Sequence, residues 1–420
     1  MAHINHYKPA ANDNASGCAL LMEIERAIKS LIETGKIPPP RRTVRFLWMN
    51  EHTGSKIYLD SRPDLKEKGV MAMNLDMVGE NILLTESVPR MTLTPDSCPS
   101  FLDDLVHQLL QYVSEVNFVE YRGTEIPFAY VVEKYNGAIS DHYWYLSGGV
   151  SVPTSFLYVY PDNFYHSNED TPDKCDPTML KRLGFVTMAA TLFAAAAGEE
   201  ETLDLSSLVW TESSKRMIQA VKEGLDDMKS ARKQDLSAAF KEAMIKLEKS
   251  SEKEEKTLRS LYKLSAAKKV KVKIDEQCES IKRLLETQQK FIEDQYKELC
   301  RDTDQKPLAI FMTNEEKRYV EIVPVRHFRG PLNLGYIKSK ISKGKSQWYD
   351  DAVRRIPDFF VIQDEIANFI DDRNSILDIR NAVSAEFGPV ALEDVFNFID
   401  GIREAGFVTY LNRSRVKIQK

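Results

Sequence analysis

Five residues of types that bind metal ions or move protons stand where a predicted strand ends or a loop begins. They are His3, Asp13, Glu51, Asp76 and His166, in the segments AHINH, ANDNASG, RFLWMNEHTGS, NLDMVGE and NFYHSNEDT. Two zinc ions that share a bridging carboxylate need a set of imidazoles and carboxylates of about this size, and one further carboxylate to accept a proton from water. The residue types therefore fit a two-metal hydrolytic site, although each residue alone also fits a structural role.

The stretch AANDNASG, residues 10–17, allows two interpretations. In the first, Asn14 or Ser16 caps the helix that follows, and Asp13 interacts with the positive end of the helix dipole. In the second, the Asn and Gly residues form a tight turn that directs the carboxylate of Asp13 at a metal ion. The local pattern alone favours capping, because capping residues are common and metal sites are not.

The first 200 residues alternate between helix and strand patterns. Helices are expected over 17–35 and 100–116, and strands over 43–50, 69–79 and 153–160. This alternation predicts a layered α/β fold with a largely parallel sheet. Six of the seven histidines lie at or before His166, and sites in such folds form at the carboxyl ends of the strands.

Composition and charge exclude several classes of protein. The chain has 420 residues, 43% of them hydrophobic, which suffices for two or three cores. The net charge of −6 argues against a protein that coats nucleic acid. Five cysteines without CxxC spacing indicate a reducing compartment, and the longest apolar run, 185–197, is shorter than a bilayer span. With no apolar signal segment, we expect a cytoplasmic protein without a membrane partner.

The segment 225–306 contains neither Gly nor Pro and carries apolar residues at helical spacing. A single helix of this length would extend about 120 Å, so we expect it to fold back near 249–255 or near 268–273. Its apolar stripe fits a solvated spacer or an arm that forms a homo-oligomer, and the sequence does not separate the two.

The segment 375–411 reads as a helix, a Gly-Pro turn, a second helix and a short strand, which is the pattern of a winged helix. From Phe359 onward it has ten acidic residues against seven basic ones. Because an acidic recognition helix is repelled by phosphates, this domain is expected to dock protein rather than DNA.

Several motifs together resemble those of the co-catalytic di-zinc aminopeptidases, peptidase family M28 of clan MH. ANDNASG, RTVRFLW, NEHTGS, NLDMVG, SDH and YHSNEDTPD occur in the order and spacing of that family, over roughly the first 200 residues. AHINHYKPAANDNASG and the distal winged helix resemble more specifically the aminopeptidase-like subgroup with a C-terminal winged-helix domain. The resemblance implies a three-layer αβα domain with a mostly parallel mixed sheet.

The resemblance also implies the metal ligands. His3 and Asp76 would bind one zinc ion, His166 would bind the other, and Asp13 would bridge both. Two zinc ions per chain are then expected.

Four further residues receive roles from the same resemblance. Glu51 would be the general base, and Tyr165 would stabilise the oxyanion. Asp141 and His142 would support the ligands or line the substrate pocket.

The chain departs from the family pattern after Glu51. Family members usually have two adjacent glutamates, a base and then a ligand, whereas here His52 follows Glu51. Either His52 replaces the ligand carboxylate, or Glu51 is the ligand and no base remains. We favour His52 as a zinc ligand, because imidazole binds zinc well and a lost base would be a lost activity.

A second departure concerns His3. In the family the equivalent histidine ends a central strand that a further stretch of chain precedes, whereas here only Met1 and Ala2 come before it. We therefore expect His3 to lack rigid support, as it would in a domain without its N-terminal strands.

The sequence predicts three regions: a zinc aminopeptidase-like domain over 1–202, a helical hairpin over 203–306 and a winged-helix domain over 307–420. The leading hypothesis is a zinc-dependent aminopeptidase acting on peptides. One alternative is a catalytically degenerate interaction protein that keeps the peptidase fold. Another is a peptide-sensing regulator that binds DNA, which the acidic C-terminal region argues against.

Overall fold

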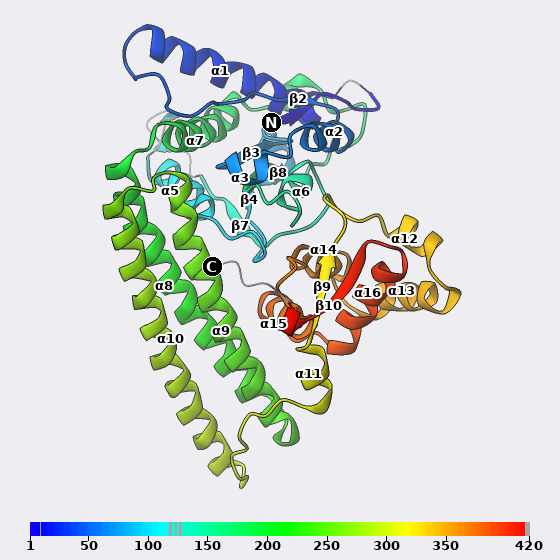
Figure 1. Ribbon diagram of the computed structural model, residues 1–420. Helices are drawn as coiled ribbons and strands as arrows, with labels where there is room; N and C mark the ends of the chain where they lie inside the picture. The colour runs from blue at the N-terminus through cyan, green and yellow to red at the C-terminus, as the bar shows by residue number, and fades with distance from the viewer. Residues whose placement is uncertain (9, 117–119, 122–123, 126–127, 416–420) are drawn as a thin grey trace. The chain divides into compact units, whose positions relative to one another are not determined.

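The computed structural model describes residues 1–8, 10–116, 120–121, 124–125 and 128–415, and the chain divides into two compact units. The first unit comprises 1–146, 150–205 and 261–270, and the second comprises 147–149, 206–260 and 271–420. The first is a mixed α/β domain and the second is mostly helical (Figure 1). The expected α/β class is confirmed, while the domain boundaries at 202 and 306 stay predictions.

A mixed four-stranded sheet forms the centre of the first unit, in the order β3-β8-β4-β7. Strand β3 runs parallel to β8, β4 runs parallel to β7, and β4 runs antiparallel to β8. A parallel pair, β1 and β2, lies beside β3. The bounds are β1 Ala2–His3, β2 Trp48–Met49, β3 Ala72–Leu75, β4 Val88–Thr92, β7 Val131–Glu133 and β8 Thr154–Tyr160.

Strand β1 is held on both sides by backbone hydrogen bonds. The amide of Ala2 donates to the Leu47 carbonyl at 3.1 Å, and the amide of Leu75 donates to the Met1 carbonyl at 2.9 Å. As a result His3, which ends β1, is only 3% exposed. The expectation that His3 lacks rigid support is wrong, because β2 and β3 fix this strand between them.

Helices pack on the sheet in two groups, which lie on opposite sides of β3 and β8 in Figure 1. One group is α1 (Gly17–Glu33), α5 (Phe101–Glu115) and α7 (Pro177–Ala196); the other is α2 (Thr53–Ser61) and α6 (His142–Leu146). The helices expected over 17–35 and 100–116 are confirmed, whereas the strand expected over 43–50 is reduced to β2. Smaller elements are α3 Leu65–Lys68, α4 Ile82–Thr85, β5 Glu120–Tyr121 and β6 Thr124–Glu125.

Helix α7 contains the long apolar run of the sequence. By length and composition it is the one helix of the described residues that could cross a membrane, and 50% of the relevant window is buried inside the protein. Leu183, Val186 and Ala190 on this helix are fully buried. A single partly buried helix of this kind is also what the core of a soluble domain contains, so it is weak evidence for a span.

The helical segment of the second unit folds back twice, with α8 (Glu199–Ser230) and α10 (Lys268–Asp302) each shared between the two units. Helix α9 (Leu236–Ser260) continues through 249–255, one of the two positions at which a turn is expected. The chain turns instead at 261–267, just before the other expected position, 268–273. Phe240 stacks on Tyr296, with ring centroids 4.1 Å apart, and both belong to a core shared with Leu247 and Ile292. Much of the apolar stripe is therefore covered within this bundle.

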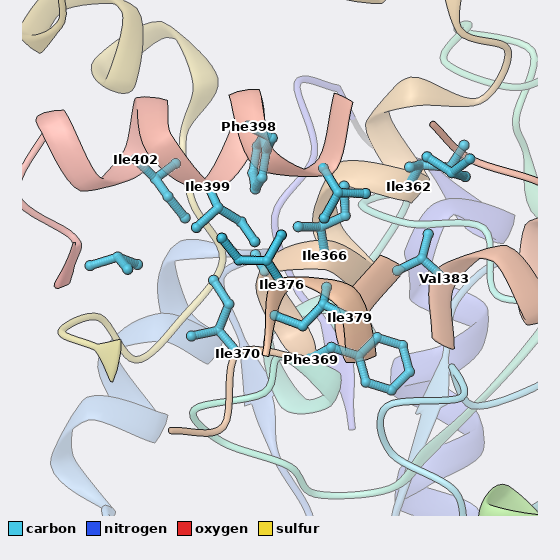
Figure 2. Packing of buried hydrophobic residues seen from close by; sticks show 14 of the residues in the cluster. Ile362, Ile366, Phe369, Ile370, Ile376, Ile379, Val383, Phe398, Ile399 and Ile402 are labelled. Atoms are coloured by element: carbon cyan, nitrogen blue, oxygen red, sulfur yellow. The ribbon is translucent and has the colours of Figure 1, made fainter. Parts of the chain in front are cut away.

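The C-terminal part of the second unit packs around isoleucines and phenylalanines of three helices (Figure 2). These helices are α14 (Phe359–Asn368), α15 (Ile376–Phe387) and α16 (Leu392–Glu404). Strand β10 (Val408–Asn412) then pairs antiparallel with β9 (Ile322–Arg326). The predicted helix, turn, helix and strand are present, and the winged-helix assignment stays a prediction. The remaining helices are α11 Asn314–Tyr319, α12 Leu334–Lys340 and α13 Lys343–Arg355.

Acidic residues of α16 are neutralised within this domain. Asp394 binds Arg355 through two hydrogen bonds of 2.9 and 2.6 Å. Asp400 accepts hydrogen bonds from Lys345 and Arg403. These acids thus hold α13 and α16 together, which gives the acidic character of this region a structural cause.

Candidate metal centre and active site

The turn Ala11–Ser16 fixes the position of Asp13, which is 4% exposed. The carboxylate of Asp170 accepts the backbone amides of Asn12 and Asp13, at 2.7 and 3.0 Å. The side chain of Asn12 in turn donates to Asp162 at 3.0 Å. Asp170 thus holds the backbone of the turn and Asp162 holds the side chain of Asn12, and neither contact uses the carboxylate of Asp13.

Gly17 is required where the turn enters α1. The Asn14 Oδ1 atom accepts hydrogen bonds from the amides of Gly17 and Met77, at 3.1 and 3.3 Å. A Cβ atom on Gly17 would lie 2.4 Å from that oxygen and 2.5 Å from the Leu75 carbonyl oxygen. Asn14 therefore does cap the helix entry, while Asp13 points elsewhere, so the two interpretations of this stretch apply to different residues.

His3, Asp13 and Asp76 form a buried group of potential ligands. His3 Nε2 lies 3.3 Å from Asp13 Oδ1 and 3.1 Å from Asp76 Oδ1. His3 Nδ1 lies 3.0 Å from the Asn5 carbonyl oxygen, which can only accept a hydrogen bond. The proton of a neutral His3 therefore sits on Nδ1, and Nε2 is free to bind a cation. Ser140 donates to the other oxygen of Asp76, at 2.8 Å.

His6, Asp13 and His166 form a second group. His6 Nε2 and His166 Nε2 lie 3.4 and 3.1 Å from Asp13 Oδ2, so the two oxygens of Asp13 face different groups. His6 Nδ1 lies 2.9 Å from the Lys8 carbonyl oxygen. Its Nε2 atom is buried and makes no hydrogen bond among the described residues. A buried imidazole nitrogen without a hydrogen-bond partner is typical of a metal ligand in a structure that holds no ion.

The sequence interpretation missed His6 as a ligand. The signal that could have found it is the spacing His3-x-x-His6 directly after a predicted strand, because two imidazoles so close at a strand end can reach the same site. Asp170, in the motif YHSNEDTPD, was missed as well, and its two hydrogen bonds to the turn give it a clear structural role.

The spacing of these atoms suits zinc. Within each group the ligand atoms all lie within 4.8 Å of one another, and the closest pairs are 3.1 to 3.4 Å apart. Zinc bonds of about 2.0–2.1 Å in tetrahedral geometry place neighbouring ligand atoms roughly 3.3 Å apart. The two groups thus have the donor types and spacing of two zinc sites that share Asp13.

The electrostatics of the first group also favour a cation. Burial would lower the pKa of His3, but Asp13 and Asp76 outweigh it and raise the pKa to about 11. Burial acts to raise the pKa of Asp13, yet its hydrogen bond to His3 and the charges of His6 and His166 hold it below the usual value. Without a metal ion, two carboxylates therefore retain a proton on His3, and a metal ion would take the place of that proton.

A cavity of about 670 Å³ opens beside both groups. Its lining includes the potential ligands, Glu51 and His52, and a set of aromatic residues, Tyr7, Phe156, Tyr158, Tyr160 and Tyr165. Glu51 belongs to neither ligand group. Burial, together with the negative charges of Asp76, Asp141 and Asp13, raises the pKa of Glu51 to about 7. The charge of His3 acts in the opposite direction but is outweighed. A carboxylate with this pKa can both accept and return a proton near neutral pH.

Tyr165 stacks on the potential ligand His166, with ring centroids 3.6 Å apart. Its side chain lines the cavity, and burial together with the charge of Asp13 raises its pKa to about 12. The hydroxyl is thus protonated at neutral pH and able to donate. His166 has φ of 57°, a conformation that non-glycine residues adopt at a cost, as His52 and Met77 also do around this cavity.

His52 is not placed with either ligand group of the described residues. Its Nδ1 atom accepts a hydrogen bond from Trp144 Nε1 at 3.1 Å, and its Nε2 atom lies 3.8 Å from Glu51 Oε1. Asp141 is buried and accepts the backbone amide of His52 at 2.8 Å, so it supports the loop after Glu51. His6, rather than His52, completes the second group.

His142 lies away from the ligands, in the core of the domain. It is fully buried, stacks on Phe156 with ring centroids 4.5 Å apart, and is not part of the cavity lining among the described residues. Burial lowers the pKa of its imidazole to about 3, so the ring is neutral. Its neighbourhood is that of a packed aromatic side chain rather than a substrate contact.

Comparison with known proteins relates the first domain to a known family. Residues 1–191 match the sequence model of peptidase family M28. No curated protein matches the chain. The crystal structure of a candidate peptidase from Clostridium acetobutylicum aligns with a TM-score of 0.33 and 13% identity, over 98% of this chain and 56% of that one. The chain thus spans little more than half of that protein, and a likeness of this size identifies no activity. The match shows that residues 1–191 carry the sequence pattern of peptidase family M28.

Proposed function

We propose that the chain is a zinc-dependent aminopeptidase. The observation that carries the proposal is the position of Asp13, whose two carboxylate oxygens face two different groups of imidazole and carboxylate ligands. This arrangement stands beside Glu51, which is free of both groups. Two-metal peptidases need this combination of a shared carboxylate and a separate base.

The residues that would hold zinc are His3, Asp13 and Asp76 for one ion and His6, Asp13 and His166 for the other. Each set leaves room for a further ligand from solvent or substrate, as a catalytic zinc site requires. Zinc bound there would lower the pKa of a water molecule and polarise a peptide carbonyl.

The chain's own groups supply the proton transfers. Glu51 accepts a proton from the attacking water and returns it to the leaving amine. The Tyr165 hydroxyl donates a hydrogen bond to the carbonyl oxygen as negative charge develops there. Asp141 holds the backbone after Glu51, and Asp170 holds the backbone at Asp13, so both the base and the bridging ligand are fixed before substrate binds.

The aminopeptidase specificity rests on the cavity. A volume of about 670 Å³ accommodates a few residues of a peptide rather than a long segment. Its aromatic wall favours an apolar first side chain.

Metal analysis combined with peptidase assays tests this proposal. Wild-type protein should contain two zinc ions and hydrolyse a leucine anilide, while the N-acetylated substrate should react more slowly by about 100-fold or more. Glu51→Gln should retain both ions and lose hydrolysis by at least about 100-fold, because only the base is removed. Loss of zinc from Glu51→Gln would instead make Glu51 a ligand.

The non-catalytic alternative makes a different prediction from the same assay. A degenerate interaction protein would bind little zinc and hydrolyse neither substrate. The intact ligand groups favour the enzyme, and a full complement of zinc with no turnover on peptides of varied sequence would contradict it. Docking of a protein partner on the C-terminal domain, and oligomer formation through the helical bundle, are compatible with either function and remain separate proposals.

A further inference from the structure

His52 is left without the role expected from its position in the sequence. It directly follows Glu51 and lines the cavity, yet it belongs to neither ligand group, since His6 stands in the second one. A polar side chain held at this place, in a backbone conformation with φ of 54°, calls for an explanation.

Trp144 fixes the tautomer of the neutral His52 ring. The indole Nε1–H can only donate, and it lies 3.1 Å from His52 Nδ1, so Nδ1 must be the unprotonated acceptor. The neutral imidazole therefore carries its hydrogen on Nε2. That nitrogen makes no hydrogen bond among the described residues, and its nearest charged neighbour is Glu51 Oε1 at 3.8 Å.

The backbone of His52 is fixed as well. Its amide donates to the buried carboxylate of Asp141 at 2.8 Å. The ring and the backbone are thus held by two different partners from the segment 141–144, and the free Nε2–H faces the carboxylate of the preceding residue. Hydrogen bonds of catalytic groups are often long in the free protein and shorten when substrate binds.

We propose that His52 is a positioning residue, whose Nε2–H donates to Glu51 Oε1 and so leaves the other carboxylate oxygen directed at the water molecule. Trp144 makes this possible by enforcing the tautomer that carries the hydrogen on Nε2. The inference rests on the proposed function for its catalytic consequence, whereas the tautomer itself can be observed independently.

Three variants of the zinc-loaded, full-length protein test the role. His52→Ala should lower kcat by about tenfold with KM within about twofold of wild type, because the base loses orientation while substrate contacts remain. His52→Gln, whose amide can still donate, should recover kcat to within about threefold. Trp144→Phe should lower kcat by about threefold, because the ring is then free to change tautomer. Zinc content should be unchanged in all three.

A matched control separates tautomer loss from general damage. Trp210→Phe removes an indole of α8 whose Nε1 has no hydrogen-bond partner among the described residues, and it should leave kcat unchanged. Nitrogen-15 NMR of the imidazoles should show the Nε2–H form of His52 in wild type and in Trp210→Phe, and a mixture of tautomers in Trp144→Phe.

Three results would overturn the inference: a wild-type kcat in His52→Ala, a loss of zinc from that variant, or an Nδ1–H tautomer in wild type. Failure of the proposed function looks different. In that case the wild-type protein itself hydrolyses no peptide, while the NMR experiment still decides the tautomer of His52.

Discussion

The two ligand groups differ in how the fold supports them. In the first, the side chains of His3, Asp13 and Asp76 are 3%, 5% and 8% exposed, and both His3 and Asp76 stand at the ends of strands in the sheet. In the second, the side chains of His6 and His166 are 12% and 39% exposed and come from irregular segments. The first group is therefore preorganised by backbone pairing, whereas the second depends on loops.

This difference predicts which of the two ligand groups binds a metal ion more tightly. Ligands on rigid elements bind metal with less loss of conformational freedom than ligands on loops. The first group should thus hold its ion more tightly, and the second should hold an ion that exchanges more readily. Asp13 belongs to both groups, so two ions bound there would not be fully independent.

Removing the shared ligand is the largest perturbation. Asp13→Ala should weaken metal binding at both groups by well over about 100-fold. This loss is larger than the effect expected from removing a residue that only supports a ligand. Hydrolysis should disappear with the metal. Elemental analysis after gel filtration measures the loss, and retention of one tightly bound ion would show that the first group does not need Asp13.

A smaller effect on both groups is expected from Gly17→Ala. The added Cβ would meet the Leu75 carbonyl oxygen at 2.5 Å, and the turn that carries Asp13 must shift to avoid it. We expect a loss of about 1–3 kcal/mol in the free energy of unfolding, together with weaker zinc binding. Gly344→Ala is the control, because a Cβ there meets nothing within 4 Å. Equal thermal stability of the two variants would argue against a steric role for Gly17.

The order of metal release sharpens the comparison directly. Stepwise dialysis against a chelator should remove the ion of the second group first, at about tenfold lower chelator concentration than the ion of the first. Cobalt substitution allows each step to be followed by absorption, and His166→Ala should abolish only the early step. A single cooperative release of both ions would contradict the difference between the groups.

Proton release should accompany binding at the first group. The pKa of His3 is raised to about 11 by Asp13 and Asp76, so the metal-free ring is protonated at pH 7, whereas a zinc ligand must be unprotonated. About one proton should therefore leave His3 for each ion bound there, and affinity should rise roughly tenfold per pH unit above pH 7, up to the pKa of His3. Calorimetry in two buffers of different ionisation enthalpy measures this number. Affinity independent of pH over this window would contradict the protonated state of His3.

Much of the first domain could be predicted from the sequence because local patterns determine it. The helices α1 and α5 follow apolar periodicity, and β8 follows a run of apolar and aromatic residues between turn residues. Strand β2 is shorter than its apolar run because only two of its residues pair with β1. Pairing of this kind depends on distant segments, so no local pattern gives its length.

The candidate site, too, could be predicted from the sequence only in part. His3, Asp13, Asp76 and His166 were expected together from their motifs, and the structure brings them together. From the sequence, His52 is favoured as a ligand and His6 is given no role, although the spacing His3-x-x-His6 places a second imidazole at the same strand end. The choice between them depends on the direction of each ring, which Lys8 determines for His6 and Trp144 determines for His52.

Zinc content of His6→Ala and His52→Ala, measured side by side on protein purified with excess zinc and then desalted, tests the central claim most directly. The wild-type protein should contain two ions per chain, His6→Ala about one, and His52→Ala two. Two ions in His6→Ala together with one in His52→Ala would place His52 in the metal centre and contradict the arrangement described for the second group.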